Sequence, residues 1–155
     1  MESNTVTAVG VWFYCINTKR YLYLMRDDPR HPNSWGLVGG KCEEGESLLD
    51  AIYRECYEEI GLDFVNTKFL PLEKFTSPDG IFVYHTFFCT TNIEFVPILN
   101  EEHIGYAWIQ SGTWPKPMHP GLWNTVTIDA VKEKMALLEK DLESTNYYIN
   151  DTVVA

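Results

Sequence analysis

The strongest constraint on the fold is one amphipathic helix set between segments rich in strand-forming residues. Over residues 47–60 the apolar positions recur at spacings of three and four, which predicts a helix with a single buried stripe. Ser47 with Asp50 predicts a capping box at its start, and Gly61 is a natural C-terminal stop. The stripe consists of Leu49, Ile52, Cys56 and Ile60.

β-branched and aromatic runs on both sides of this helix predict strands. We expect strands at Val6–Ile16, Tyr21–Met25, Trp35–Val38, Lys68–Phe75, Phe82–Thr90 and Tyr106–Ile109. The first two form a hairpin around residues 17–20, and another turn lies at 77–80. A Pro-rich loop at Ser111–Gly121 precedes a second predicted helix at Thr125–Glu143. Strands and helices mixed in this way predict an α/β fold, with a mixed sheet flanked by helices.

Charge limits the class of partner. The chain carries 12 Lys and Arg against 22 Asp and Glu, a net charge of −10. A surface with this much negative charge repels phosphate backbones and anionic lipids. We therefore expect no general nucleic-acid binding and no membrane partner. A substrate that bears several phosphates would need a divalent cation to offset this charge.

Length and cysteine usage indicate a simple organisation. The 155 residues predict one domain at 1–146 and a C-terminal tail at 147–155. No apolar run approaches the ~20 residues of a membrane span, and the first residues lack the features of a secretory signal. The four cysteines form no C-x-x-C pair, so we expect a reducing, cytoplasmic compartment without disulfides.

Three carboxylates crowd one side of the first helix. Glu55, Glu58 and Glu59 lie three and four residues apart, so they share a helix side. Their mutual repulsion raises their pKa values, unless solvent or a cation relieves it. Arg54 lies in i,i+4 reach of Glu58 and can orient a carboxylate. Two interpretations stay open here: a solvated acidic face, or a site for Mg²⁺, which takes oxygen ligands and suits phosphate-bearing substrates.

The segment Gly40–Leu62 resembles the signature of the Nudix hydrolases. That signature is a Gly, five residues, a Glu, seven residues, and then Arg-Glu-apolar-x-Glu-Glu-x-Gly-apolar. Cys56 fills a position usually given to Leu, Val or Ala, and Val38 precedes the glycines where the family often has Pro. The fixed positions are occupied here by Gly40, Glu46, Arg54, Glu55, Cys56, Glu58, Glu59, Gly61 and Leu62.

The resemblance implies a Nudix-like α/β/α sandwich and a metal-dependent pyrophosphohydrolase. Water would attack phosphorus in a nucleoside diphosphate linked to another moiety, with Mg²⁺ or Mn²⁺ as the cofactor. Arg54 and Glu46 would hold the loop and helix together, and Gly39 would lie close to the substrate. The implied metal ligands are Glu55, Glu58 and Glu59, together with Gly40, whose carbonyl lies near the metal in this family.

A further acidic candidate precedes the last predicted strand. Glu102 stands six residues before Trp108, as in dinucleoside tetraphosphate hydrolases and RNA pyrophosphohydrolases, where such a Glu faces the metals. This resemblance makes Glu102 an expected extra metal ligand or general base. The alternative is that Glu101 and Glu102 are surface charges on a loop. We interpret the adjacent His103 as structural.

Arg26 closes the second predicted strand and is a candidate for binding a substrate phosphate with two hydrogen bonds. An ion pair with Asp27 or Asp28 is the competing interpretation. Alternating aromatic residues on the strands, including Tyr84, favour core packing over base stacking.

Substrate choice stays open among the small nucleotides. Pro78 resembles a weak signature of ADP-ribose hydrolases, whereas Glu102, His103 and Trp108 favour dinucleoside polyphosphates or 5′-triphosphate RNA. The acidity of the chain disfavours long RNA. A single domain also fits hydrolysis of nucleoside triphosphates or their deoxy forms. The competing classes are a nucleotide-binding or sensor module that keeps the motif without cleavage, and a calcium-binding acidic domain, which lacks the Asp/Asn/Gly loop pattern. A homodimer is compatible with the sequence.

Overall fold

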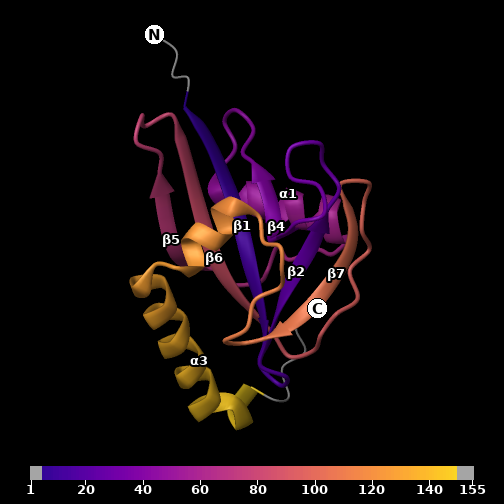
Figure 1. Ribbon diagram of the computed structural model, residues 1–155. Coiled ribbons are helices and arrows are strands. Elements are labelled where there is room, and N and C mark those ends of the chain that lie inside the picture. The colour runs from indigo at the N-terminus through magenta and orange to yellow at the C-terminus, as the bar shows by residue number, and fades with distance from the viewer. Residues whose placement is uncertain (1–4, 150–155) are drawn as a thin grey trace.

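The computed structural model of the protein describes residues 5–149, with side chains described for 5–143. Within these residues seven strands form one mixed sheet, and helices cover both of its faces (Figure 1). The elements in chain order are β1 (Val6–Cys15), β2 (Arg20–Arg26), β3 (Trp35–Gly36), β4 (Val38–Lys41), α1 (Leu48–Ile60), β5 (Leu70–Thr76), β6 (Phe82–Thr91), β7 (His103–Gln110), α2 (Pro120–Val126) and α3 (Asp129–Ile149). The α/β class and the expected hairpin of β1 and β2 are confirmed.

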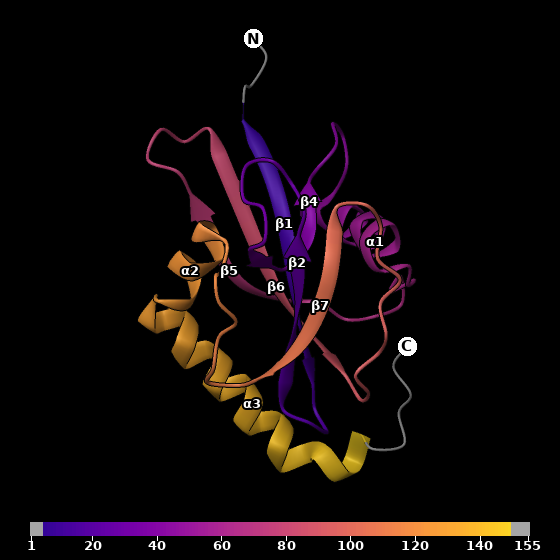
Figure 2. The same ribbon diagram turned by 45° about the vertical axis from the view of Figure 1, so that its right-hand side comes forward.

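Strand β1 is the centre of the sheet. It pairs in parallel with β6 along its whole length and with β2 only at the hairpin end, where Tyr14 lies opposite Tyr21. Further along, β4 takes the place of β2 and pairs with residues 8–11 of β1. Strand β2 leaves β1 at this point, and along its whole length it pairs with β7, which runs beside it in Figure 2. The sheet therefore divides beside β4, next to the carboxylates of α1.

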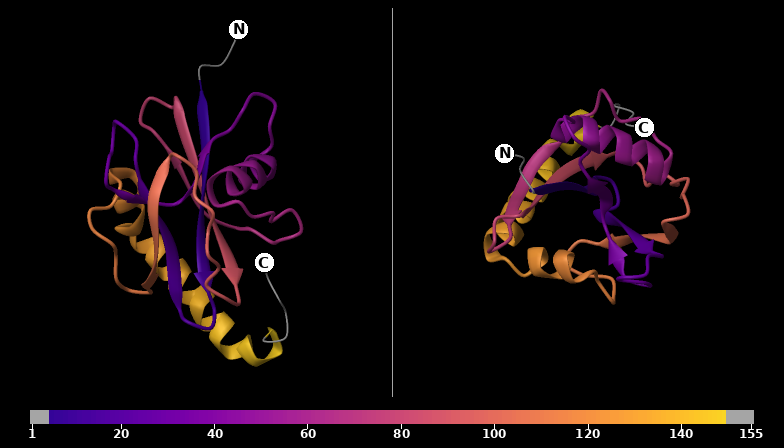
Figure 3. Two further views of the ribbon diagram at one scale, coloured as in Figure 1. Left: turned by 90° about the vertical axis from the view of Figure 1, so that its right-hand side faces the viewer. Right: turned by 90° about the horizontal axis from the view of Figure 1, so that it is seen from above.

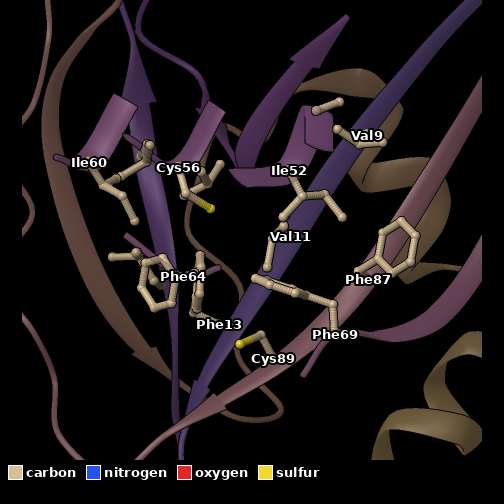
Figure 4. Close-up of a cluster of buried hydrophobic side chains, with 14 of the residues drawn as sticks. Val9, Val11, Phe13, Ile52, Cys56, Ile60, Phe64, Phe69, Phe87 and Cys89 are labelled. Carbon is tan, nitrogen blue, oxygen red and sulfur yellow. The ribbon is translucent and has the colours of Figure 1, made fainter. Parts of the chain in front are cut away.

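Figure 3 shows α1 on one face of the sheet and α2 with α3 on the other, and an apolar layer lies on each face. The first lies between the sheet and α1, and Figure 4 shows Ile52, Cys56 and Ile60 of α1 facing Val11 and Phe13 of β1. The second lies under α2 and α3, and Trp12, Tyr21 and Phe88 are buried in it. Burying such aromatic side chains is the main favourable term of folding.

Helix α1 begins and ends where the sequence predicts. Ser47 Oγ accepts a hydrogen bond from the backbone N–H of Asp50 at 3.1 Å, and Gly61 adopts the left-handed conformation at φ 71°. The predicted stripe needs one correction, because Leu49 is 44% exposed. The buried side of α1 consists of Ala51, Ile52, Glu55, Cys56, Glu59 and Ile60.

The C-terminal region differs from the single predicted helix at Thr125–Glu143. A short helix, α2, already begins at Pro120 inside the predicted loop, because proline is pre-organised for the first helical turn. The chain leaves α2 at Thr127 and starts α3 at Asp129, whose negative charge suits a helix N-terminus. Helix α3 continues to Ile149, three residues into the predicted tail at 147–155, and residues 150–155 lie outside the described part.

The predicted strand Trp35–Val38 is also corrected. It divides at Leu37 into β3, which pairs with β2, and β4, which pairs with β1. The division follows from the opening of the sheet, since one straight strand cannot pair with both neighbours after they separate. In the described part of the chain, none of the helices is long and apolar enough to span a bilayer.

The histidine at the start of α2 is expected to make the stability of the fold depend on pH. His119 Nδ1 accepts the backbone N–H of Gly121 at 3.0 Å, and burial, together with the charge of Arg26, lowers the pKa of His119 from 6.5 to about 4. The unfolded chain therefore binds the proton more tightly. This contribution to stability is present above pH 6.5 and is lost as the pH falls towards 4.

Asparagine at this position caps a helix without titrating. We expect the free energy of unfolding of wild type, relative to His119→Asn, to fall by about 1–2 kcal/mol between about pH 7 and pH 4, after a discount for partial exposure. Urea unfolding of both proteins across this range measures the difference. Parallel stability curves for the two proteins would contradict the capping role.

Candidate active site

Arg54 ties the loop before α1 to the helix. Its Nε and Nη2 donate to the two carboxylate oxygens of Glu46 at 2.8 and 3.0 Å, and Nη2 also donates to the carbonyl of Lys41 at 2.9 Å. Glu46 in turn accepts the backbone N–H of Glu43 at 2.9 Å. These bonds lower the pKa of Glu46 and raise the pKa of Arg54. The structure thus brings together the two residues expected to support the loop.

The same guanidinium also orients two of the three clustered carboxylates. Arg54 Nη1 donates to Glu55 at 2.7 Å and to Glu58 at 3.3 Å, the i,i+4 contact that the spacing predicts. The Glu55 side chain is only 9% exposed, whereas that of Glu58 is 48% exposed. Glu58 therefore lies at the solvent side of the cluster and Glu55 faces the sheet.

Glu59 is the most buried carboxylate of the cluster, with 3% of the residue exposed. Its Oε1 accepts the backbone N–H of Gly39 at 2.9 Å, which anchors α1 to β4. Burial raises the pKa of Glu59 to about 9, and burial also raises the pKa of Glu55, to which Glu59 is hydrogen-bonded. Because the two carboxyl groups are adjacent and buried, a cation bound between them would displace any proton that they share.

Two glycines of β4 make this close approach feasible. A Cβ on Gly40 would lie 2.7–2.8 Å from the Glu55 carboxyl group, too close for any side chain. A Cβ on Gly39 would collide with the backbone carbonyl of Val9 on β1. Because these glycines have no side chains, the carboxylates of α1 can contact the backbone of β4, and the Gly40 backbone lies beside Glu55.

Glu102 reaches the same region from the loop before β7. Its charge contributes to the raised pKa of Glu59, and its backbone carbonyl accepts the N–H of Asp27 at 2.9 Å. Asn100 Nδ2 donates to the Glu102 carboxylate at 3.2 Å and fixes the loop. Glu102 and the neighbouring Glu101 are both exposed. The ring of His103 is buried, which lowers its pKa, and this agrees with the structural interpretation.

Arg26 forms an ion pair with Asp28, which is the alternative to phosphate binding that the sequence left open. Its Nε donates to Asp28 at 2.6 Å, and backbone N–H groups of the following loop also hold the Asp28 carboxylate. These hydrogen bonds lower the pKa of Asp28 to about 2. The positive charge of Arg26 helps to lower the pKa of His119 and opposes the rise in the pKa of Tyr84, so the guanidinium lies near both side chains.

The arrangement of the acidic side chains indicates whether a divalent cation fits at the cluster on α1. Among the described residues, no three His, Cys, Asp or Glu side chains converge as a ready-made metal site, because Glu58 turns to Arg54. The donor chemistry fits nevertheless. Glu55 and Glu59 are adjacent buried carboxylates, the Glu102 charge lies nearby, and all three supply the oxygen ligands that Mg²⁺ prefers. A cation here would replace the proton and relieve the repulsion.

One residue beside this cluster was missed from the sequence. Tyr84 appears there only as part of an alternating strand, but its hydroxyl lies where a Cβ on Gly10 would stand. Its ring crosses from β6 to β1 and approaches the cluster closely enough for Glu59 to raise its pKa. The available signal was Gly10, an isolated glycine in a strand, which marks a close approach.

Comparison with known proteins agrees with this geometry. The nucleoside triphosphatase NudI of Escherichia coli O17:K52:H18 is 34% identical over 107 residues, which cover 61% of this chain and 75% of that relative. The solved E. coli dihydroneopterin triphosphate pyrophosphohydrolase aligns with a TM-score of 0.57 and 27% identity, over 67% of this chain and 80% of that one. A MutT NUDIX hydrolase from Burkholderia pseudomallei, at 21% identity, shares the fold with a TM-score of 0.61, over 81% and 96%.

The family model of the NUDIX domain matches residues 5–126 of this chain. This range includes the whole sheet, α1 and α2. Since the match spans most of the chain and its relatives carry hydrolase names, the chain belongs to the Nudix hydrolases, enzymes that act on phosphoric anhydride bonds.

Proposed function

We propose that this protein is a metal-dependent pyrophosphohydrolase of nucleoside triphosphates or closely related triphosphates. The observation that carries the proposal is the buried pair of Glu55 and Glu59 against the glycines of β4, in a chain of net charge −10. Among the substrate classes left open by the sequence, triphosphates are favoured because NudI is named a nucleoside triphosphatase and the 27%-identical structure a triphosphate pyrophosphohydrolase.

The residues of the site have separate roles in this proposal. Mg²⁺ or Mn²⁺, when bound, supplies charge neutralisation for the phosphates and a polarised water. Glu102, on the opposite loop, accepts the proton of the attacking water. The expected cation ligands are the carboxylates of Glu55, Glu58 and Glu59, together with the backbone carbonyl of Gly40.

Two basic residues act on position and charge. The bonds from Arg54 to Glu46 and Glu55 hold the loop and carboxylates in one arrangement, so Arg54 is a positioning residue. Arg26 attracts the distal phosphates of the substrate, with Asp28 fixing its orientation. The backbones of Gly39 and Gly40 border the same space and leave it free of side chains.

Removal of divalent cations tests this proposal directly. We expect EDTA to abolish hydrolysis of nucleoside triphosphates and excess Mg²⁺ or Mn²⁺ to restore it, because the carboxylate cluster cannot approach polyphosphate without a cation. Turnover is measured over a panel of about twenty nucleotide derivatives, with both products identified by mass.

The panel separates this proposal from the competing classes. Tight nucleotide binding without cleavage would identify a binding or sensor module instead of an enzyme. Cleavage confined to ADP-ribose or dinucleoside polyphosphates would keep the family chemistry and overturn the substrate class. Undiminished turnover in excess EDTA would overturn the metal requirement.

A further inference from the structure

One further acidic residue lies on the face of the sheet opposite α1, apart from the carboxylates already described. Glu73 of β5 stands opposite Thr86 of β6, on the face that α2 covers. Burial raises the pKa of Glu73, and the nearby Thr125 hydroxyl of α2, which donates to the carbonyl of Gly121, opposes this rise. The Oε1 atom of Glu73 is buried and has no hydrogen-bond partner within the described residues. A buried acceptor of this kind is unfavourable unless a donor arrives from outside the chain.

The other unpartnered buried atoms have nearby explanations. The Trp12 indole N–H approaches the Tyr23 hydroxyl closely enough to lower its pKa against the effect of burial. The unpartnered Nδ1 of His103 lies at the first residue of β7, directly after Glu102 and opposite Arg26 of β2. Glu73 differs from both, because its free acceptor lies beside a half-open aromatic surface.

That surface consists of Tyr84, Phe82 and Phe75. Phe75 lies opposite Tyr84 across β5 and β6, and the Phe82 ring centroid lies 6.2 Å from that of Tyr84 and 6.5 Å from that of Phe75. Phe75 is 43% exposed, and none of the three side chains belongs to either buried core cluster. An aromatic surface that neither core uses can stack a planar heterocycle.

Tyr84 joins this surface to the catalytic cluster. The Tyr84 hydroxyl lies where a Cβ on Gly10 would stand, and Gly10 pairs with Gly39, whose N–H donates to Glu59. On its other side Tyr84 pairs with Phe75 of β5, two residues from Glu73. The phenol therefore lies between the strand that Glu59 anchors and the strand that carries Glu73. A nucleotide with its phosphates at Glu59 would place its ring over Tyr84 and the edge of that ring at Glu73.

A carboxylate distinguishes heterocycles by the order of their donors. A 2-amino-4-oxopyrimidine edge, as in guanine and pterins, presents a ring N–H beside an amino group, and both donate to one carboxylate. Adenine and cytosine place an acceptor nitrogen beside the amino group, and thymine and uracil flank their N–H with carbonyls. Those edges repel an ionised carboxylate at one or two positions.

We propose that Glu73 is a specificity-determining residue that accepts hydrogen bonds from a 2-amino-4-oxopyrimidine edge, with the ring stacked on Tyr84. This inference rests on the proposed function and names its substrate class: guanine nucleoside triphosphates or a pterin triphosphate. Both sources share the chemistry that Glu73 reads, so the experiment must separate them.

The test compares GTP with ITP, which lacks only the 2-amino group. We expect wild type to hydrolyse GTP with a kcat/KM at least about tenfold higher, because the missing donor leaves the carboxylate unpaired. Glu73→Gln is expected to bring the two substrates within about twofold. Glu133→Gln, an exposed residue of α3, is the matched control and should keep the wild-type ratio. Equal kcat/KM values for GTP and ITP in wild type would overturn the inference, even if the variant fails to fold.

Two further measurements complete the design. Dihydroneopterin triphosphate, assayed beside GTP, separates a pterin from a guanine source, and rejection of both would overturn the inference. Binding of GMP and IMP is measured without turnover, by calorimetry. If no triphosphate is hydrolysed but GMP binds more tightly than IMP in a Glu73-dependent way, the proposed function fails and this inference stands. Hydrolysis without GMP–IMP discrimination gives the opposite result.

Discussion

Replacing Glu59 by glutamine is expected to lower kcat by about 10²–10⁴-fold while the metal-free protein stays folded. The change removes one negative ligand from the cation site, and a cation that stabilises transition-state charge contributes several kcal/mol at about 1.4 kcal/mol per tenfold. Gln keeps an oxygen in position to accept the N–H of Gly39, so the anchor between α1 and β4 survives. Removing one of two adjacent buried acids also lowers their repulsion.

The measurement has a kinetic and a thermal part. We expect Mg²⁺ to raise the Tm of wild type, because it binds only the folded state, and to raise that of Glu59→Gln much less. Glu133→Gln provides a control with the same chemical change on an exposed part of α3. If Glu59→Gln unfolds the protein but each folded molecule turns over at the normal rate, the cluster is structural and its catalytic assignment is wrong.

The parts of the site that lie close together in sequence could be predicted. The spacing of Arg54 and Glu58 already specifies their i,i+4 contact, and the caps at Ser47 and Gly61 specify where the helix begins and ends. A helix repeats every 3.6 residues, so relative positions of side chains on α1 follow from spacing alone. The one error in the stripe, Leu49, arose because Glu55 and Glu59 take part of the buried side.

The parts that depend on pairing between distant strands could not be predicted. Tyr84 meets Gly10 only because β6 pairs in parallel with β1, and Glu73 reaches this face only because the register of β5 shifts between Pro71 and Glu73. A shift of one residue moves every side chain to the other face of a sheet, and periodicity does not reveal it. The break before α3 was missed for a related reason, since the helical pattern continues across it.

Glu102→Gln is the second substitution with a large expected effect. We expect kcat to fall by about 10²–10⁴-fold, the range for loss of a general base, because the amide cannot accept the proton of the attacking water. The Mg²⁺-dependent rise in Tm should remain largely intact, since Glu55 and Glu59 lie on another element. Kinetics at saturating Mg²⁺ and thermal unfolding with and without the cation measure the two effects separately.

Glu101→Gln is the matched control, because it makes the same change at the adjacent, exposed position of the same loop. It should leave both kcat and the effect of Mg²⁺ within about twofold of wild type. Glu102 differs from it in two ways: Asn100 donates a hydrogen bond to its carboxylate, and its charge helps to raise the pKa of Glu59. A carboxylate that Asn100 holds on a loop near the buried pair is placed to act on a water bound there. If both substitutions are equally silent, the base lies on another element and the loop only borders the site.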